Sequence, residues 1–270
     1  MADGLNLTGV GLEIGASHNP LLRKSEGHDI RIADHLDQAG LIAKYEGLRP
    51  TGRIEHVDYV LKPGRLTESI DDRFDYILAS HLLEHTVCMI SFLQDCQELL
   101  RPGGIVSLAL PDKRYCFDQL RERTSLGRVI DVYHAQPLVH SYGSVLEHNL
   151  NMVTKHSVAK SGGVAWFPGA PGELSLRVPL HIARQRADTA ASGSYVDTHN
   201  WVLTPHHFRL LVHDLQSLGY IDLSVRSFTD TIDHEFFVQL WREPAPPSDR
   251  KELLRLAADE QRTTEPAVLI

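Results

Sequence analysis

The sequence predicts an α/β fold in which helices connect the strands of a largely parallel sheet. Two observations support this prediction. Short apolar strand signals alternate with helical signals through the first half, and one helix followed by two strand signals closes the second half. Strands that alternate with helices form parallel sheets through right-handed crossovers. A chain of 270 residues can bury a sizeable core, so neither disulfides nor metals are needed for folding.

Three short apolar segments in the first part of the chain are predicted strands. Residues 10–14 end at Gly15, residues 29–33 end at Asp34, and residues 75–79 follow a polar turn. Apolar residues at helical spacing then predict a helix over residues 84–100. Pro102-Gly103-Gly104 ends this helix, and residues 105–110 form a buried strand.

Regular patterning returns at Thr204-Pro205, where Thr suits the N-cap and Pro the first helical turn. The elements predicted from there on are an amphipathic helix over 205–218 closed by Gly219, strands over 221–227 and 236–241, and a terminal helix over 249–261.

Residues 112–200 differ from both flanks, because they are rich in Gly, Pro, Ser and His and carry only short periodic pieces. Both ends of this segment join the same sheet at the carboxyl ends of its strands, where such sheets bind ligands. We therefore expect a single domain over residues 1–242, with 112–200 as an inserted cap or lid. Residues 243–270 form a C-terminal linker and helix.

Composition excludes several classes of partner. The formal net charge is -8 and no basic stripe is present, which argues against nucleic acid and acidic membranes. No apolar run reaches transmembrane length and no signal peptide is recognisable, so a cytoplasmic location is expected. The three cysteines match neither a disulfide framework nor a zinc knuckle, and we expect buried, reduced thiols.

The strongest local signal is Gly11-Leu12-Glu13-Ile14-Gly15-Ala16-Ser17 at the end of the first strand. Small residues there let the backbone turn sharply and approach a ligand. Asp34 lies 21 residues after Glu13 and ends the next strand, where a carboxylate can accept both hydroxyls of a ribose. A tight strand–helix turn beside an unrelated surface Asp explains these residues equally well.

Two further motifs favour the nucleotide interpretation. Phe74-Asp75-Tyr76-Ile77-Leu78-Ala79-Ser80 leads into His81-Leu82-Leu83-Glu84-His85, and Leu99-Leu100-Arg101-Pro102-Gly103-Gly104 precedes an apolar strand. In order and spacing, residues 9–111 resemble the class I S-adenosylmethionine-dependent methyltransferases, in particular the branch with Leu-Glu-His after the fourth strand. The resemblance implies a doubly wound seven-stranded sheet with an antiparallel last strand, and S-adenosylmethionine bound across the carboxyl ends of the strands.

The same resemblance implies roles for individual residues. It places Glu13, Gly15 and Ala16 around the methionine portion of the cofactor, Asp34 on the ribose, Asp58 near adenine, and Ser80 and His81 facing the methyl group and substrate. The chain departs from the family at Ala16, Ser17 and Asn19, where glycines are usual, and it nearly lacks the N-terminal helix. That side of the pocket would be closed by the insertion or by a second subunit, so a homo-oligomer is possible.

Further candidates lie after the fifth strand. His81 is the candidate general base, since a base needs a pKa near the working pH and reach to a substrate hydroxyl. Asp112, Arg114, His199 and Trp201 are candidate substrate residues. Arg114 suits bidentate binding of an anion and Trp201 stacking on a ring, although a solvated turn and a small core are equally consistent with them. Asp112, Asp197 and His199 form no metal motif, so no metal is predicted.

These features predict methyl transfer to an oxygen of a small hydroxylated molecule or glycan. A catalytically silent cofactor-binding or interaction subunit is the alternative. A nicotinamide-dependent oxidoreductase is less favoured, because its Gly-x-Gly-x-x-Gly turn is missing.

Overall fold

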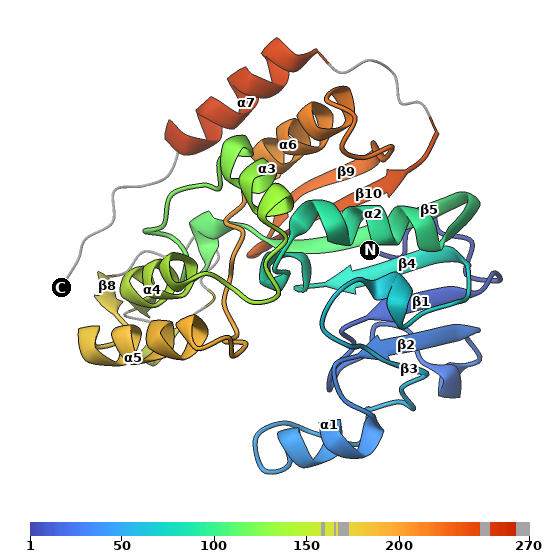
Figure 1. Cartoon of the computed structure of the whole chain (residues 1–270), viewed down its shortest axis with the longest axis horizontal. Coiled ribbons are helices and arrows are strands. Elements are labelled where there is room, and N and C mark those ends of the chain that lie inside the picture. The colour runs from blue at the N-terminus through green and yellow to red at the C-terminus, as the bar shows by residue number, and fades with distance from the viewer. Residues whose placement is uncertain (158–159, 165, 167–172, 244–248, 263–270) are drawn as a thin grey trace.

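The computed structural model describes residues 1–157, 160–164, 166, 173–243 and 249–262 (Figure 1). Within this part of the chain, the main sheet has seven strands in the order β3-β2-β1-β4-β5-β10-β9. β10 pairs antiparallel with both β5 and β9, while β1 to β5 pair parallel with one another. The predicted doubly wound sheet with an antiparallel last strand is confirmed. The strands are β1 (Gly11–Ile14), β2 (Ile30–Asp34), β3 (Tyr59–Val60), β4 (Phe74–Ser80), β5 (Leu100–Pro111), β9 (Ser224–Ile232) and β10 (Glu235–Trp241).

Both faces of the sheet are buried, as parallel strands require. Side chains alternate along β4, so that Ile77 and Ala79 join the core on one face while Tyr76 and Leu78 join the core on the other. The first core is completed by α2 (Met89–Leu99), α3 (Leu126–Ala135) and α6 (Pro205–Ser217), and the second includes Leu41 of α1 (Gln38–Tyr45).

The predicted helix over 84–100 is wrong in its first five residues. Leu83–His85 form a separate 3-10 turn, and α2 begins at Met89 after Cys88, whose Sγ accepts from the backbone N–H of Ser91. The predicted start of α6 at Thr204-Pro205 is confirmed, and α7 (Arg250–Arg262) packs along α6. All three cysteines are free thiols, and Cys96 and Cys116 are buried.

Residues 112–200 are more regular than predicted. They contain α3, α4 (Tyr142–Asn151), α5 (Leu180–Ala191) and a three-stranded sheet of β6 (Val153–Ser157), β7 (Lys160–Val164) and β8 (Glu173–Leu176). α3 packs on α2 in the main core, whereas α4 and α5 pack together around Val145 and Ala187. Alanines line the buried face of α5, and alanine contributes little to an apolar periodicity, so the sequence pattern understated this helix. Pro168-Gly169-Ala170-Pro171-Gly172, whose composition predicts a turn, lies outside the described residues.

The N-terminal ten residues form no helix, in keeping with the departure noted in the sequence. Instead, Ser107 Oγ and Gln239 Nε2 donate hydrogen bonds to the carbonyl of Met1, which fastens this segment over β5 and β10. In the described part of the chain, none of the helices combines the length and the apolar character needed to cross a membrane.

Candidate functional site

Of the predicted site residues, one group lies at the carboxyl ends of β1, β2 and β4: Glu13, Gly15, Ala16, Asp34, Ser80 and His81. β1 lies between β2 and β4, and successive connections leave it in opposite directions along the sheet. In open α/β sheets this switch point leaves a crevice beyond the strand ends, where ligands bind.

The turn after β1 directly contacts the end of β2. Gly15 has φ +72°, and a Cβ there would lie 3.0 Å from Cδ1 of Leu82, so the position demands glycine. Ser17 is also left-handed, with φ 55°, and its N–H donates to Asp34 Oδ2 at 2.8 Å. The structure therefore brings together the residues Gly15 to Ser17 and Asp34, which we call the glycine-turn site.

Asp34 is only 2% exposed, and its carboxylate is already partly engaged. Oδ1 accepts from the backbone N–H of His35 at 2.8 Å and lies 2.5 Å from Nδ1 of the same residue. A carboxylate offers about four acceptor positions. The His35 ring is half exposed, so its rotation would free a second position beside the one left open on the carboxylate. The residues present therefore fit a ribose diol after a local side-chain movement.

Glu13 has a structural role at the same turn. Its buried carboxylate accepts from the N–H of Leu21 at 2.8 and 3.1 Å and from that of Leu22 at 3.3 Å. Burial raises the pKa of Glu13 to about 7 although these hydrogen bonds lower it. Ala16 is buried in the second core. Both residues shape the loop that follows β1.

The expectation for Asp58 is wrong in its placement. The third strand begins at Tyr59, so Asp58 precedes this strand instead of following it. Its carboxylate accepts from Lys24 Nζ at 2.6 Å and from the backbone N–H of Ile32 at 2.7 Å. A two-residue strand gives no readable periodicity, which explains the misplacement. Asp58 stabilises the edge of the sheet.

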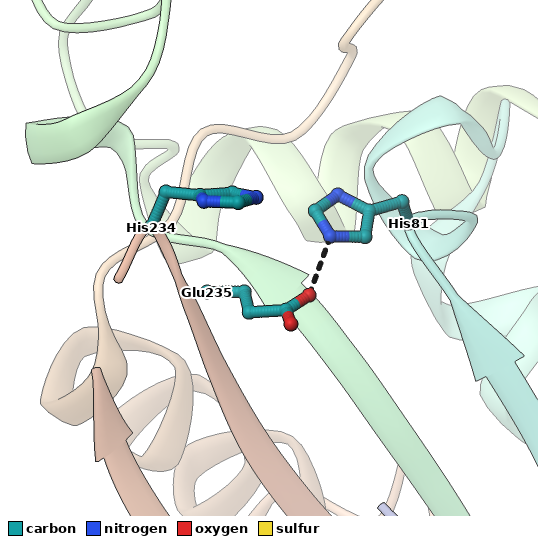
Figure 2. A group of neighbouring side chains, drawn as sticks. All are labelled: His81, His234 and Glu235. Carbon is teal, nitrogen blue, oxygen red and sulfur yellow. Dashed lines mark hydrogen bonds and ion pairs between the residues drawn. The ribbon is translucent and has the colours of Figure 1, made fainter. Parts of the chain in front are cut away.

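Ser80 is the last residue of β4, and His81 follows it with a left-handed φ of 49°. Nε2 of His81 lies 2.7 Å from Oε2 of Glu235 (Figure 2). Nδ1 of the same ring lies 3.5 Å from Oε1 of Glu84. Burial lowers the pKa of His81, but these two carboxylates outweigh burial and raise it to about 9. A protonated imidazole cannot accept a proton, so the structure does not support His81 as a general base at neutral pH.

Asp112 and Arg114 bind each other. Arg114 donates two side-chain hydrogen bonds to the buried Asp112 carboxylate at 3.0 Å and 2.5 Å, and Thr231 Oγ1 donates a third at 2.6 Å. Asp112 holds the pKa of Arg114 above its usual value although burial alone would lower it. Asp112 neutralises the charge of Arg114 inside the fold, so the expected anion-binding role is not supported.

Trp201 belongs to the main core. Its side chain is 1% exposed, and Nε1 donates to the carbonyl of Thr86 at 2.8 Å. A buried indole that has satisfied its single donor offers no face to a substrate. The core interpretation, which the sequence left open, is the correct one.

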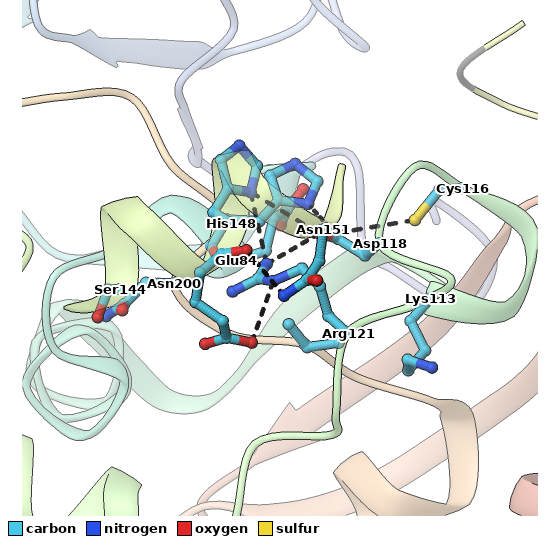
Figure 3. A network of polar contacts seen from close by, with 12 residues as sticks. Glu84, Lys113, Cys116, Asp118, Arg121, Ser144, His148, Asn151 and Asn200 are labelled. Atoms are coloured by element: carbon cyan, nitrogen blue, oxygen red, sulfur yellow. Dashed lines mark hydrogen bonds and ion pairs between the residues drawn. The ribbon is translucent and has the colours of Figure 1, made fainter. Parts of the chain in front are cut away.

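His199, in contrast, lies in a group of titratable side chains that sequence analysis recognised only in part. We call this group the histidine cluster: His81, Glu84, His85, Asp118, His148, His199, His234 and Glu235. Nδ1 of His199 lies 2.5 Å from Oδ2 of Asp118, and Arg121 donates to Oδ1 of that carboxylate at 2.8 Å. Asp118 and Arg121 are both buried, and Figure 3 shows them beside His148. His199 and Arg121 hold the pKa of Asp118 well below its usual range despite burial, which alone would raise it.

Trp166 connects the inserted segment to this cluster. Its ring centroid lies 5.2 Å from that of His81, 4.9 Å from that of His234 and 5.3 Å from that of Phe117. Trp166 also forms an isolated β-bridge with Cys116. Residues from the segment 112–200 thus contact the loop that follows β4.

Comparison with known proteins adds sequence relatives to this geometry. No family model matches the chain. The ubiquinone biosynthesis O-methyltransferase of Cereibacter sphaeroides is 29% identical over 108 residues, which are 38% of this chain and 40% of that protein. The protein of the same name from Parvibaculum lavamentivorans is 34% identical over 53 residues, 20% of this chain and 21% of that protein. This chain therefore spans about two fifths of the length of the first of these relatives.

Solved structures are more distant. The methyltransferase CcbJ from Streptomyces caelestis has a TM-score of 0.43 at 11% identity, over 86% of this chain and 87% of that chain. The resemblance to class I methyltransferases predicted from the sequence is confirmed by the strand order and by the curated methyltransferase relatives. The Leu-Glu-His branch within that class stays a prediction.

Proposed function

We propose that this protein binds S-adenosylmethionine at the glycine-turn site and transfers its methyl group to an oxygen of a small hydroxylated molecule or glycan. One observation carries the proposal: the left-handed turn at Gly15–Ser17 is hydrogen-bonded to Asp34 at the switch point of a doubly wound sheet. The sequence relatives named O-methyltransferases support the reaction type.

In this proposal Asp34 binds the ribose, and the backbone of Gly15 to Ser17 borders the methionine portion. S-adenosylmethionine would supply the electrophilic methyl group. The protein would supply alignment, since methyl transfer needs orientation above all and needs a base only when the acceptor must lose a proton. Ser80 lies at the end of β4 between the glycine-turn site and the histidine cluster, where an acceptor would meet the methyl group.

Isothermal titration with S-adenosylmethionine and its demethylated product tests the cofactor site. Asp34→Asn removes a charged acceptor of two hydroxyl hydrogen bonds, so we expect affinity to fall by about tenfold or more. Asp58→Asn is the matched control, because that carboxylate faces Lys24 and Ile32 and should leave affinity unchanged. Equal affinity of the wild type and Asp34→Asn would remove Asp34 from the site.

Turnover requires a separate test, because a cofactor-binding subunit without activity would pass the titration. Labelled S-adenosylmethionine incubated with the protein and a metabolite extract should give a labelled product of low molecular mass. Cofactor binding without any labelled product would favour the silent subunit. Binding of NAD in place of S-adenosylmethionine would favour an oxidoreductase.

The inserted segment completes the proposal as a cover over the cofactor. The contacts of Trp166 with His81 and His234 support this arrangement. Amide exchange in residues 112–200 should slow when the demethylated cofactor binds. Protection confined to residues 9–85 would assign the segment to another role, such as a subunit interface.

A further inference from the structure

Glu84 is the most unusual carboxylate of the molecule. Its side chain is fully buried, and neither Oε1 nor Oε2 accepts a hydrogen bond from any described residue. Its backbone is held firmly, since its carbonyl accepts from the N–H groups of Asn200 at 2.7 Å and Trp201 at 3.2 Å. An ionised carboxylate buried without hydrogen bonds is strongly destabilising unless a cation compensates it.

The nearest cation does not provide this compensation well. His81 Nδ1 lies 3.5 Å from Glu84 Oε1, beyond the 2.7–2.9 Å typical of a charge-assisted hydrogen bond. The other ring nitrogen of His81 is already bound to Glu235. Arg121 is buried nearby, but its charge is directed at Asp118.

Two histidines face Glu84 at distances that suit a shared ion. Nε2 of His85 lies 3.9 Å from Glu84 Oε1, and the rings of His85 and His199 meet edge to face with centroids 4.5 Å apart. One ligand atom from each of the three residues lies within 4.8 Å of the others. In a tetrahedral Zn²⁺ site the ligand atoms lie about 2.1 Å from the ion and hence about 3.4 Å from one another, so the group needs to close by up to about 1.4 Å.

Both histidines are also oriented as metal ligands usually are. Nδ1 of His199 lies 2.5 Å from Asp118, and Nδ1 of His85 lies 2.8 Å from Asp197. A carboxylate on one ring nitrogen fixes the tautomer and leaves the opposite nitrogen to bind the metal.

We propose that Glu84, His85 and His199 bind a transition-metal dication, with Asp118 and Asp197 as the carboxylates that orient the two imidazoles. Two imidazoles and one carboxylate suit Zn²⁺ and neighbouring metals, and three protein ligands leave positions open for an oxygen ligand. The role we assign to the ion rests on the proposed function: it binds the acceptor hydroxyl and eases its deprotonation.

A second group, formed by His81, His234 and Glu235, also gathers three ligand atoms. All three side chains are half buried, and Glu235 already accepts from His81 (Figure 2). This group has no buried carboxylate that lacks a partner among the described residues, so we assign the ion to Glu84, His85 and His199.

Titration of the chelator-treated full chain with ZnCl₂ and with CoCl₂ tests the site in the absence of S-adenosylmethionine. We expect one ion per chain, and a Co²⁺ absorption spectrum typical of nitrogen and oxygen ligands. Glu84→Gln should weaken Zn²⁺ binding more than 100-fold. Asp118→Asn should weaken it about 10- to 100-fold, as loss of a ligand-orienting carboxylate does.

His234→Asn is the matched control and should bind Zn²⁺ like the wild type. A wild-type protein that binds no ion at micromolar ZnCl₂ would overturn the proposal. Loss of binding in His234→Asn with retention in Glu84→Gln would equally overturn it, because the ion would then occupy the second group. If Glu84→Gln does not fold, Zn²⁺ binding by Asp118→Asn and the Co²⁺ spectrum of the wild type still test whether the ion binds at this site. Cofactor affinity is measured separately without metal, so failure of this site leaves the proposed methyltransferase function untouched.

Discussion

Asp34 of the glycine-turn site and the adjoining Glu13 accept hydrogen bonds from backbone N–H groups within 17 residues of them in the sequence. In the histidine cluster, the carboxylate of Glu84 accepts no hydrogen bond from a described residue, and the cluster extends from His81 to Glu235. The first arrangement keeps its shape without a ligand. The second arrangement brings together charged side chains that are close to one another only in the folded chain. It leaves one carboxylate, that of Glu84, available to a cation.

This difference has an energetic consequence. Backbone donors satisfy the carboxylates beside the glycine turn, so the turn is preorganised for a cofactor at little cost. Buried charges in the histidine cluster must be compensated by other side chains. Removing one partner leaves the other charge buried and uncompensated, at the full cost of its desolvation. Perturbations should therefore be larger in the cluster than at the turn.

The largest effect is expected from Arg121→Met. This change leaves Asp118 buried without its guanidinium partner, which costs about 3–5 kcal/mol of the free energy of unfolding. Urea denaturation measures it. Arg255→Met removes two exposed ion pairs on α7 and should give no measurable change. A loss below about 1 kcal/mol in Arg121→Met would mean that the histidines alone compensate Asp118.

The second prediction concerns the pH dependence that Glu13 contributes. Its pKa in the folded protein is about 7, against 4.5 ordinarily, so between these values the native state binds more protons than the unfolded state. Stability is therefore fully present below the ordinary pKa and falls as pH rises toward 7, by about 3 kcal/mol in total. Glu13→Gln stays neutral and should lose this slope.

Chemical denaturation of the wild type and Glu13→Gln at about pH 5 and about pH 7.5 measures this contribution. The wild type should be the more pH-sensitive protein. Stability profiles that run parallel for the two proteins would show that Glu13 is ionised throughout. The hydrogen bonds that Glu13 accepts from Leu21 and Leu22 would then lower its pKa by more than burial raises it.

Much of the sheet was predictable because its signals are local. Apolar strands ending in Gly15 or Asp34 specify their elements within a few residues, whereas Pro102-Gly103-Gly104, expected to end the helix, lie inside β5. The position of the glycine-turn site could be predicted from these strands, since the carboxyl ends of the strands of one parallel sheet meet at one edge. β3 was missed because two residues carry no period, and α5 was understated because alanines line its buried face.

The histidine cluster was only partly predictable, because its partners come from elements far apart in the chain. His81-Leu82-Leu83-Glu84-His85 does place three candidate ligands within five residues, a signal that was available. Nothing local, however, links Asp118 to His199, 81 residues away. Arg114 and Trp201 were misassigned for the same reason: residue type shows what a side chain can bind, while only the fold shows that Asp112 and Thr86 already bind it.

A smaller effect is expected from Gly15→Ala. A left-handed φ of +72° costs an alanine about 1–2 kcal/mol, and its Cβ would press on Leu82. Gly47→Ala is the matched control, because Gly47 has φ +73° and no atom lies within 4 Å of the place that its new methyl group would occupy. Both variants should lose stability in thermal unfolding, but only Gly15→Ala should weaken binding of S-adenosylmethionine. Equal affinity in both would separate the turn from the cofactor.

The smallest effect is expected from His35→Ala. The His35 ring lies 2.5 Å from Oδ1 of Asp34 and is half exposed, so its loss should cost less than about 1 kcal/mol of stability. The backbone N–H of His35 still donates to the same oxygen at 2.8 Å, so Asp34 stays in position. Because a ribose must displace this ring, affinity for S-adenosylmethionine should be unchanged or rise by about fivefold at most, as less than 1 kcal/mol allows. A tenfold loss of affinity in isothermal titration would instead make His35 a direct contact of the cofactor, and Asp34 alone would no longer account for ribose binding.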